Sequence, residues 1–175
     1  MSDIIAADIE ALLDRTAPLW LGLRDARLFI TGGTGFFGTW LLEAVVAANR
    51  RFDLGCHATV LSRDPARFTA KSPHLATAPT VTLLAGDVRD FPFPHGPVTH
   101  VIHAATEASA ALNEAAPQAM FDVCVEGTRR VLALAAEKRA ARLLFTSSGA
   151  VYGRQPPDLT AWRRCAGTAP ACRPG

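Results

Sequence analysis

Five short apolar runs recur along the chain, and stretches in which apolar residues follow a helical spacing separate most of them. The first run ends in a glycine-rich turn, which is typical of a buried parallel strand. The later runs have the same length and character, so we expect strands there too. The expected strands are Ala26–Thr31, His57–Ser62, Thr80–Gly86, Thr99–Ala105 and Ala141–Ser148.

Two long helices are expected between these strands. The first runs from about residue 36 to 49 and the second from about 117 to 139. The inner side of the first helix is expected to carry Leu41, Leu42, Val45 and Val46.

Two shorter stretches also have helical character. The proline-bounded segment around "DPARF" is expected to hold a turn of helix after the second strand. At the amino end, Ser2 can cap a helix in which apolar residues recur at helical spacing, and Pro18 follows its expected end.

Strands that alternate with helices imply right-handed crossovers and a parallel sheet covered on both faces. The expected fold is therefore α/β, a doubly wound Rossmann sheet with strand order 3-2-1-4-5. It should occupy residues 26–153, after a helical extension over 1–25 and before an irregular tail over 154–175.

Composition narrows the classes of function. The formal charge of +2 and the lack of a basic run argue against a nucleic-acid partner. The apolar runs are too short to span a membrane, and the acidic amino end does not resemble a secretory signal, so the cytoplasm is expected. The four cysteines and five histidines show no metal-binding spacing, and neither a metal site nor a disulfide framework is expected.

The segment "TGGTGFFG" lies between the first strand and the first long helix and places Gly32, Gly35 and Gly38 at G-x-x-G-x-x-G spacing. The first glycine allows a tight turn, the second lets the backbone approach a pyrophosphate, and the third permits close packing of the helix. Unpaired N–H groups at the helix start would attract the phosphates. This context favours dinucleotide binding over an ordinary turn.

Three further segments follow strand ends. "GDVRD" places Asp87 and Val88 after the third strand, "HAAT" places Ala104 to Thr106 after the fourth, and "SSGAVYG" follows the fifth. Each alone is explained by a turn or by tight packing. Together they should emerge beside the glycine loop at the carboxyl edge of the sheet, where open α/β sheets bind ligands.

With these motifs, residues 26–153 resemble the N-terminal part of an extended short-chain dehydrogenase/reductase, the family of NAD(P)-dependent nucleotide-sugar epimerases and dehydratases. The resemblance implies that Asp87 binds the adenine amino group and that Ala104 and Ala105 line the cofactor. It implies that Ser148, three residues before the Val of Val-Tyr-Gly, is the catalytic hydroxyl that orients the reacting oxygen. It also implies a nucleotide-sugar substrate and allows a homodimer of the full-length form. The expected cofactor-binding residues are Gly32, Gly35, Phe36, Phe37, Gly38, Ser62, Arg63, Asp87, Val88, Ala104, Ala105 and Thr106.

The family uses a Tyr-x-x-x-Lys pair as its catalytic base, and this sequence departs from the family by lacking that pair. The single tyrosine is Tyr152, the last lysine is Lys138, and no such pair occurs. From Leu159 onward the chain has no acid, no lysine and no apolar periodicity, which favours out-of-frame translation after about Asp158 over a disordered Pro/Gly-rich tail. The expected product is an inactive, truncated fragment.

Two smaller departures concern the cofactor. At the end of the second strand, Ser62 and Arg63 stand where NAD enzymes place an acid, and an arginine there favours the 2′-phosphate of NADP. Asp64 could supply that acid if the strand ended one residue later. Cys124 stands where the family usually has an Asn. The chain is thus interpreted as an NAD(P)-binding fragment of a nucleotide-sugar epimerase or dehydratase, the alternative being a non-catalytic dinucleotide-binding sensor or regulatory module.

Overall fold

The computed structural model describes residues 3–105 and 115–147 of the chain. Its strands are β1 (Arg27–Thr31), β2 (His57–Ser62), β3 (Val81–Ala85), β4 (His100–His103) and β5 (Arg142–Phe145). Its helices are α1 (Asp3–Trp20), the short 3-10 helix η1 (Leu21–Leu23), α2 (Phe36–Phe52), α3 (Pro65–Lys71), α4 (Pro73–Ala76) and α6 (Pro117–Glu137).

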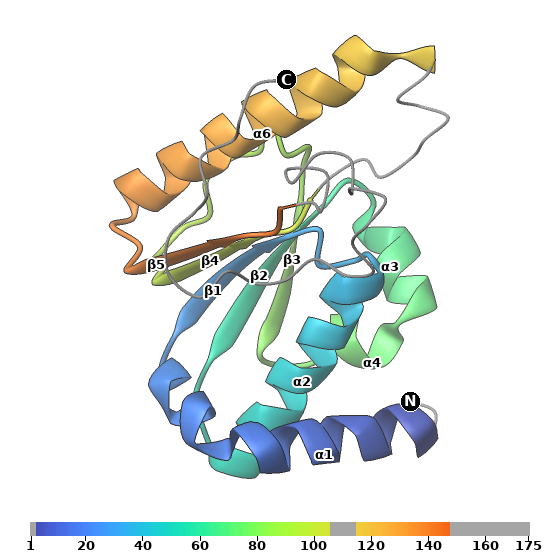
Figure 1. The fold of residues 1–175 in the computed structure, drawn as a ribbon, viewed down its shortest axis with the longest axis vertical. Helices are drawn as coiled ribbons and strands as arrows, with labels where there is room; N and C mark the ends of the chain where they lie inside the picture. Colours follow the sequence, from blue (N-terminus) through green and yellow to red (C-terminus); the bar gives the residue numbers. More distant parts are fainter. Residues whose placement is uncertain (1–2, 106–114, 148–175) are drawn as a thin grey trace, which may run out of the picture.

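All strand pairs within the described residues are parallel, and the strand order is β3-β2-β1-β4-β5. This confirms the doubly wound arrangement expected from the alternation of strands and helices. Because the chain crosses from one half of the sheet to the other after β3, the ends of β1 and β4 lie side by side and open a crevice at the carboxyl edge. Figure 1 shows the sheet at the centre, α6 on one side and α2 with α3 and α4 on the other.

Each face of the sheet has its own hydrophobic core. On one face, Leu28 and Ile30 of β1 pack with Leu42 and Val45 of α2. On the other face, Phe29 stacks on Phe91 with ring centroids 5.2 Å apart, and residues of α6 complete the cluster. The expected inner side of α2 is wrong at one position, since the side chain of Leu41 is 37% exposed. Its position in the helix turns it to the edge of the buried stripe.

The helix α1 extends further than expected, because Pro18 lies inside it and the helix ends at Trp20. A proline inside a helix removes one backbone hydrogen bond, which normally favours an earlier end. Here Trp20 packs against the core, and its indole Nε1–H donates to Oγ1 of Thr16 at 2.9 Å. These contacts hold the last turn in helical form.

The α1 helix lies across the amino-terminal side of the sheet, far from the crevice (Figure 1). Its buried residues Ile9 and Leu13 join the core that α2 forms with the sheet. At the surface, Arg51 of α2 pairs with Glu10 and Asp14 of α1 at 3.0 and 2.6 Å. The sequence-predicted extension is therefore packed onto the main fold.

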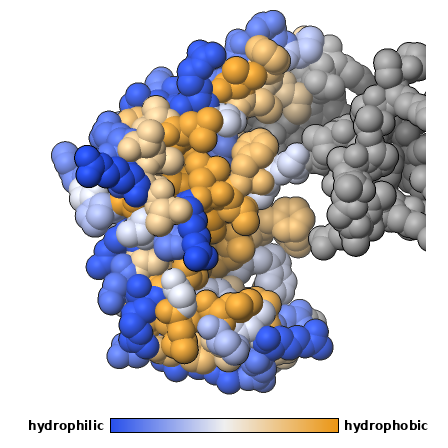
Figure 2. Space-filling model, turned by 60° about the vertical axis from the view of Figure 1, so that its left-hand side comes forward, coloured by the Kyte–Doolittle hydropathy of each residue, from blue (hydrophilic) through white to orange (hydrophobic). Residues whose placement is uncertain are grey.

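The strand β5 is the edge of the sheet in the described structure, and every residue in it is exposed. Leu143, Leu144 and Phe145 place apolar side chains on both of its faces, a composition typical of an interior strand. Figure 2 shows apolar surface gathered on this side of the molecule. In the described part of the chain no helix is long and apolar enough to cross a membrane.

Candidate cofactor site

The glycine loop connects the end of β1 to the start of α2, and its shape depends on two glycines. Gly32 has φ +73°, and a Cβ there would overlap the carbonyl group of Ala104. A Cβ on Gly38 would overlap the backbone of Gly32 and Gly33. Neither site accommodates a side chain, because the obstacles are backbone atoms that cannot rotate away. The third glycine thus lets the helix pack against the loop itself.

The N-terminus of α2 opens toward this loop. Gly35 is the N-cap, and its carbonyl oxygen accepts the N–H of Thr39 at 2.9 Å. The N–H groups of the first helical residues, Phe36 to Gly38, precede the first intrahelical bond and remain available. The side chain of Thr39 donates to the same carbonyl at 2.7 Å and so does not block them. A phosphate is the kind of anion that such a helix start binds.

A cavity of about 210 Å³ adjoins the loop at the carboxyl edge of the sheet. The ends of β1, β2, β3 and β4 all contribute to its wall. Eight of the residues singled out from the sequence line it: Gly32, Gly35, Ser62, Arg63, Asp87, Val88, Ala104 and Ala105. The structure therefore brings segments that are up to about seventy residues apart in sequence onto one concave surface, as expected for a topological switch point.

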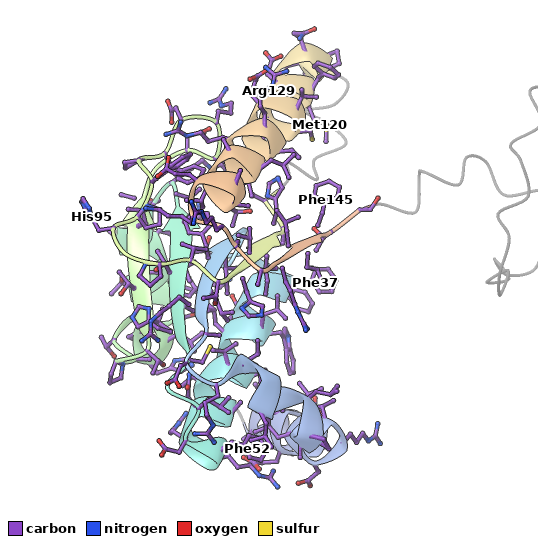
Figure 3. All side chains as sticks on the ribbon, turned by 90° about the vertical axis from the view of Figure 1, so that its left-hand side faces the viewer. Phe37, Phe52, His95, Met120, Arg129 and Phe145 are labelled. Carbon is purple, nitrogen blue, oxygen red and sulfur yellow. The ribbon has the colours of Figure 1, made fainter. Side chains whose placement is uncertain are left out.

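The remaining sequence-predicted residues lie elsewhere. Gly38 packs under the loop and does not line the cavity. Phe36 and Phe37 have side chains that are 73% and 78% exposed, and Figure 3 shows Phe37 projecting from the start of α2. These two residues can therefore contribute to the site only through their backbone N–H groups, which belong to the first turn of α2. Thr106 and Ser148 lie outside the described residues.

A second hollow of about 390 Å³ continues from the first one past the end of β2. The two share Thr34, Ser62 and Arg63. Arg67 and Lys71, both from α3, add two further positive charges to this hollow. The sequence-based prediction named Arg63 alone, because the turn of helix that carries the other two cations could not be placed relative to the strand end.

Asp64, the acidic residue that lines this hollow, stabilises the start of α3. Asp64 is the N-cap of α3, and its Oδ1 accepts the N–H of Arg67 at 2.9 Å. Its own N–H donates to Oγ of Ser62 at 3.2 Å. The β2 strand ends at Ser62, so Asp64 does not occupy the strand-end position that was considered for it.

The carboxylate of Asp87 is partly engaged. Its Oδ1 accepts both the backbone N–H and the Nε–H of Arg89, at 3.0 and 2.7 Å, and its Oδ2 accepts Nη2 at 3.2 Å. The hydrogen bond from Arg89 lowers the pKa of Asp87, and the charge of Arg63 adds to this effect. Asp87 is therefore an anion at neutral pH, and Oδ2 retains capacity for one more donor.

A hydrogen-bond network centred on the buried side chains of Thr31 and His103 was missed by sequence reasoning. Thr128 Oγ1 donates to the Cys124 carbonyl at 2.6 Å and therefore accepts the Nε2 hydrogen of His103 at 3.1 Å. His103 Nδ1 then accepts the hydroxyl hydrogen of Thr31 at 2.7 Å. Thr31 Oγ1 in turn accepts the N–H of Ala105 at 3.1 Å.

This chain of bonds joins the ends of β1 and β4 to α6 and fixes the segment after β4 in the cavity wall. Burial lowers the pKa of His103, so the imidazole is neutral, as the single arrangement of donors requires. The signal in the sequence was a histidine at the end of an apolar run, directly before "AA". Its partners are far apart in sequence and could not be paired without the sheet register.

Other lining residues also went unnoticed, namely Thr31, Thr34, Leu61, Gly86 and Val123. Most of them directly precede or follow a residue that was singled out, so the strand ends would have indicated them. Val123 comes from α6, and only the packing of that helix over β4 brings it to the cavity.

Comparison with known proteins identifies the family of the chain. Residues 28–167 match the model of the NAD dependent epimerase/dehydratase family. The chain belongs to this family. The family assignment confirms the resemblance drawn from the motifs, and the match includes the glycine loop and all the strand ends that form the cavity.

Individual relatives show the same kinship. The chain is 33% identical over 151 residues to cinnamoyl-CoA reductase 1 from Oryza sativa subsp. japonica. The matched region covers 76% of this chain and 39% of that protein. It is 25% identical to a dTDP-glucose 4,6-dehydratase from Streptomyces venezuelae solved with NAD bound, with a TM-score of 0.56 over 67% of this chain and 38% of the other. It shares the fold of a UDP-glucose-4-epimerase from Stenotrophomonas maltophila solved with NAD, at 22% identity and a TM-score of 0.63 over 82% and 43% of the two chains. The chain thus spans about 40% of the length of these relatives.

Proposed function

We propose that this chain binds NAD(P) in the cavity beside the glycine loop, as the dinucleotide-binding part of an enzyme that acts on a nucleotide sugar. The observation that carries the proposal is the meeting of the glycine loop with the ends of β2, β3 and β4 on one concave wall. The loop fits the group, because it leaves free the space that a side chain at Gly35 would occupy beside an open helix start.

Different residues of the cavity contact different parts of the cofactor in this proposal. The N–H groups at the start of α2 bind the pyrophosphate, and Gly35 lets the backbone come close to it. The Oδ2 atom of Asp87 accepts the adenine amino group, while Val88 and the Ala104–Ala105 segment bound the cavity. Bound NAD(P) supplies a hydride acceptor or donor, and this chain's own residues hold it in place and exclude water from its apolar side.

NADP should bind at least as tightly as NAD. The hollow beyond β2 is lined by Arg63, Arg67 and Lys71. Its one acidic residue, Asp64, caps α3. Three cations against one carboxylate, which caps α3 through Oδ1, favour a 2′-phosphate over a pair of ribose hydroxyls.

A nucleotide-sugar substrate is supported by the family and by structural neighbours whose names include UDP-glucose and dTDP-glucose. The kinship with a cinnamoyl-CoA reductase supports a second candidate, the reduction of an acyl-CoA thioester. In either reaction Ser148 would orient the reacting oxygen.

The 175-residue chain itself should show no turnover. The family's Tyr-x-x-x-Lys base does not occur in it, and Tyr152 is four residues from Ser148 with no lysine after it. Without a neighbouring ammonium, a phenol has an ordinary pKa of about 10, which is too high for a base at neutral pH.

Calorimetric titration of the full chain with NADP and NAD tests the proposal. Both should bind, NADP at least as tightly, and Arg63→Gln should weaken NADP about tenfold while changing NAD little, since a charged hydrogen bond to phosphate is lost. Arg15→Gln, which removes the same charge from an exposed position on α1, is the matched control. Absence of binding by either dinucleotide would contradict the proposal, and a clear NAD preference unaffected by Arg63→Gln would contradict the NADP assignment.

A further inference from the structure

The face of the sheet that α6 covers is left partly open. The connection from β3 to β4 contains Pro92, Pro94 and Pro97 and forms no helix, although parallel strands are usually joined by one. Prolines at this spacing prevent a helix from forming. The amino-terminal half of β1, β2 and β3 therefore faces a groove of about 740 Å³ instead of a helix.

The sequence of the strands is adapted to this groove. Arg27 of β1 lies in register with His57 of β2, and Thr59 of β2 lies in register with Thr82 of β3. Residues in register share a face of the sheet, so these four polar side chains form two adjacent rows in the groove. The opposite face of the same strands is apolar and buried. Parallel sheets are normally apolar on both faces, so polar rows confined to the uncovered region indicate a surface that contacts water or a ligand.

The groove also has an apolar wall. Leu84 of β3 and Phe93 line it together with the three prolines. Phe93 is fixed in place, because the guanidinium of Arg130 lies 4.1 Å from its ring centroid and Phe91 lies 5.7 Å away. A fixed apolar wall that faces polar groups is typical of pockets that bind small organic molecules. Such pockets have volumes of about 300–1,000 Å³.

The groove carries the positive charge of Arg27. Its other ionisable residues are His57, His95 and the buried Cys56, and no carboxylate lines it. Arg27 donates to the carbonyl oxygen of Gly55 at 2.8 Å and, within the described residues, forms no ion pair. Burial and the charge of Arg27 lower the pKa of His57, which keeps that imidazole neutral. Its Nε2 atom already shares a hydrogen bond with Oγ1 of Thr82 at 3.3 Å. His95 projects from the loop at the rim (Figure 3).

We propose that this groove is a second ligand site that binds a small amphipathic organic carboxylate. The carboxylate would pair with Arg27 and accept one hydrogen bond from the bonded pair of His57 and Thr82 and another from Thr59. Its hydrocarbon part would lie against Leu84 and Phe93. An anion would balance the charge of the Arg27 guanidinium, which has no ion-pair partner among the described residues, and an apolar body would match the wall. The site is distinct from the dinucleotide cavity, with which it shares no lining residue, and so goes beyond the function proposed above.

The test uses the full chain and 4-phenylbutyrate as the probe, followed through the ring resonances of the histidines by NMR. We expect saturable shifts at His57 and none at His103, which is buried at the end of β4 and does not line the groove. Arg27→Gln should weaken the affinity about tenfold, as loss of a charged hydrogen bond requires. Arg15→Gln is the charge-matched control on α1.

Two further measurements keep the proposal open to refutation if Arg27→Gln does not fold. The uncharged amide of the same probe should bind at least tenfold more weakly to the unchanged protein, and Thr82→Val, at an exposed position, should weaken the acid severalfold. Saturating NADP should leave the affinity for the probe unchanged, and this result holds whether or not NADP itself binds. Shifts that do not saturate, equal binding of acid and amide, equal binding of inorganic phosphate, or displacement by NADP would each overturn the proposal.

Discussion

Alanine substitutions in the glycine loop separate the glycines that the fold needs from the one that the cofactor needs. At Gly32 an alanine must adopt a positive φ, at a cost of about 1–2 kcal/mol, and its methyl group meets the backbone after β4. Forced overlap with atoms that cannot rotate away costs about 1–3 kcal/mol more. The free energy of unfolding of Gly32→Ala should therefore fall by about 2–5 kcal/mol.

Gly35→Ala is the contrasting variant. Its φ is −78°, and the added Cβ would meet only the carbonyl oxygen of Gly32, at 3.3 Å. Stability should change by less than about 1 kcal/mol. The methyl group would nevertheless stand in the cavity wall where the pyrophosphate is proposed to lie, and NADP affinity should fall about tenfold or more.

Thermal unfolding followed by circular dichroism, together with NADP titration, measures both effects. For a chain of this size about 2–4 °C of Tm corresponds to 1 kcal/mol, so Gly32→Ala should lower the Tm by about 4–20 °C. Gly22→Ala, where a Cβ would meet nothing within 4 Å, is the control and should change neither quantity. An unchanged Tm for Gly32→Ala would refute the packing argument, and unchanged NADP affinity for Gly35→Ala would refute the placement of the pyrophosphate.

Three other variants or conditions have definite expectations. Leu13→Ala should lower the free energy of unfolding by about 2–4 kcal/mol, because it empties a fully buried site under α1, and should leave NADP affinity unchanged because α1 lies far from the cavity. Burial raises the pKa of the Cys56 thiol to about 11, so peptide mapping after iodoacetamide treatment at pH 8 should show the exposed Cys124 modified well before Cys56; equal rates would contradict the burial. The pKa of His103 is lowered from 6.5, so its contribution to stability is present above pH 6.5 and is lost as the pH falls through the folded-state value; denaturant titrations should show this loss in the parent chain and less of it in His103→Gln.

Much of the fold could be predicted from the sequence because its signals are local. The strands and the two long helices followed from the spacing of apolar residues, and the strand order followed from their alternation. The convergence of Arg63, Asp87 and Ala104 on one cavity followed from the rule that parallel strands end at the same edge. Each of these inferences used a pattern within one segment plus a general rule of topology.

The features that were missed depend on contacts between distant segments. The continuation of α1 past Pro18 depends on Trp20 finding the core, and the engagement of Asp87 depends on which way Arg89 turns. The network around His103 needs the register of β1 with β4 and the position of α6. Local propensity contains no information about such partners.

The most direct test of the central claim is the position of the cofactor in a crystal structure of this chain grown with NADP. We expect density for the pyrophosphate against the N–H groups at the start of α2, the adenine beside Asp87, and the 2′-phosphate within reach of Arg63. A dinucleotide bound away from the glycine loop, or one with its adenine end directed away from β2 and β3, would contradict the account.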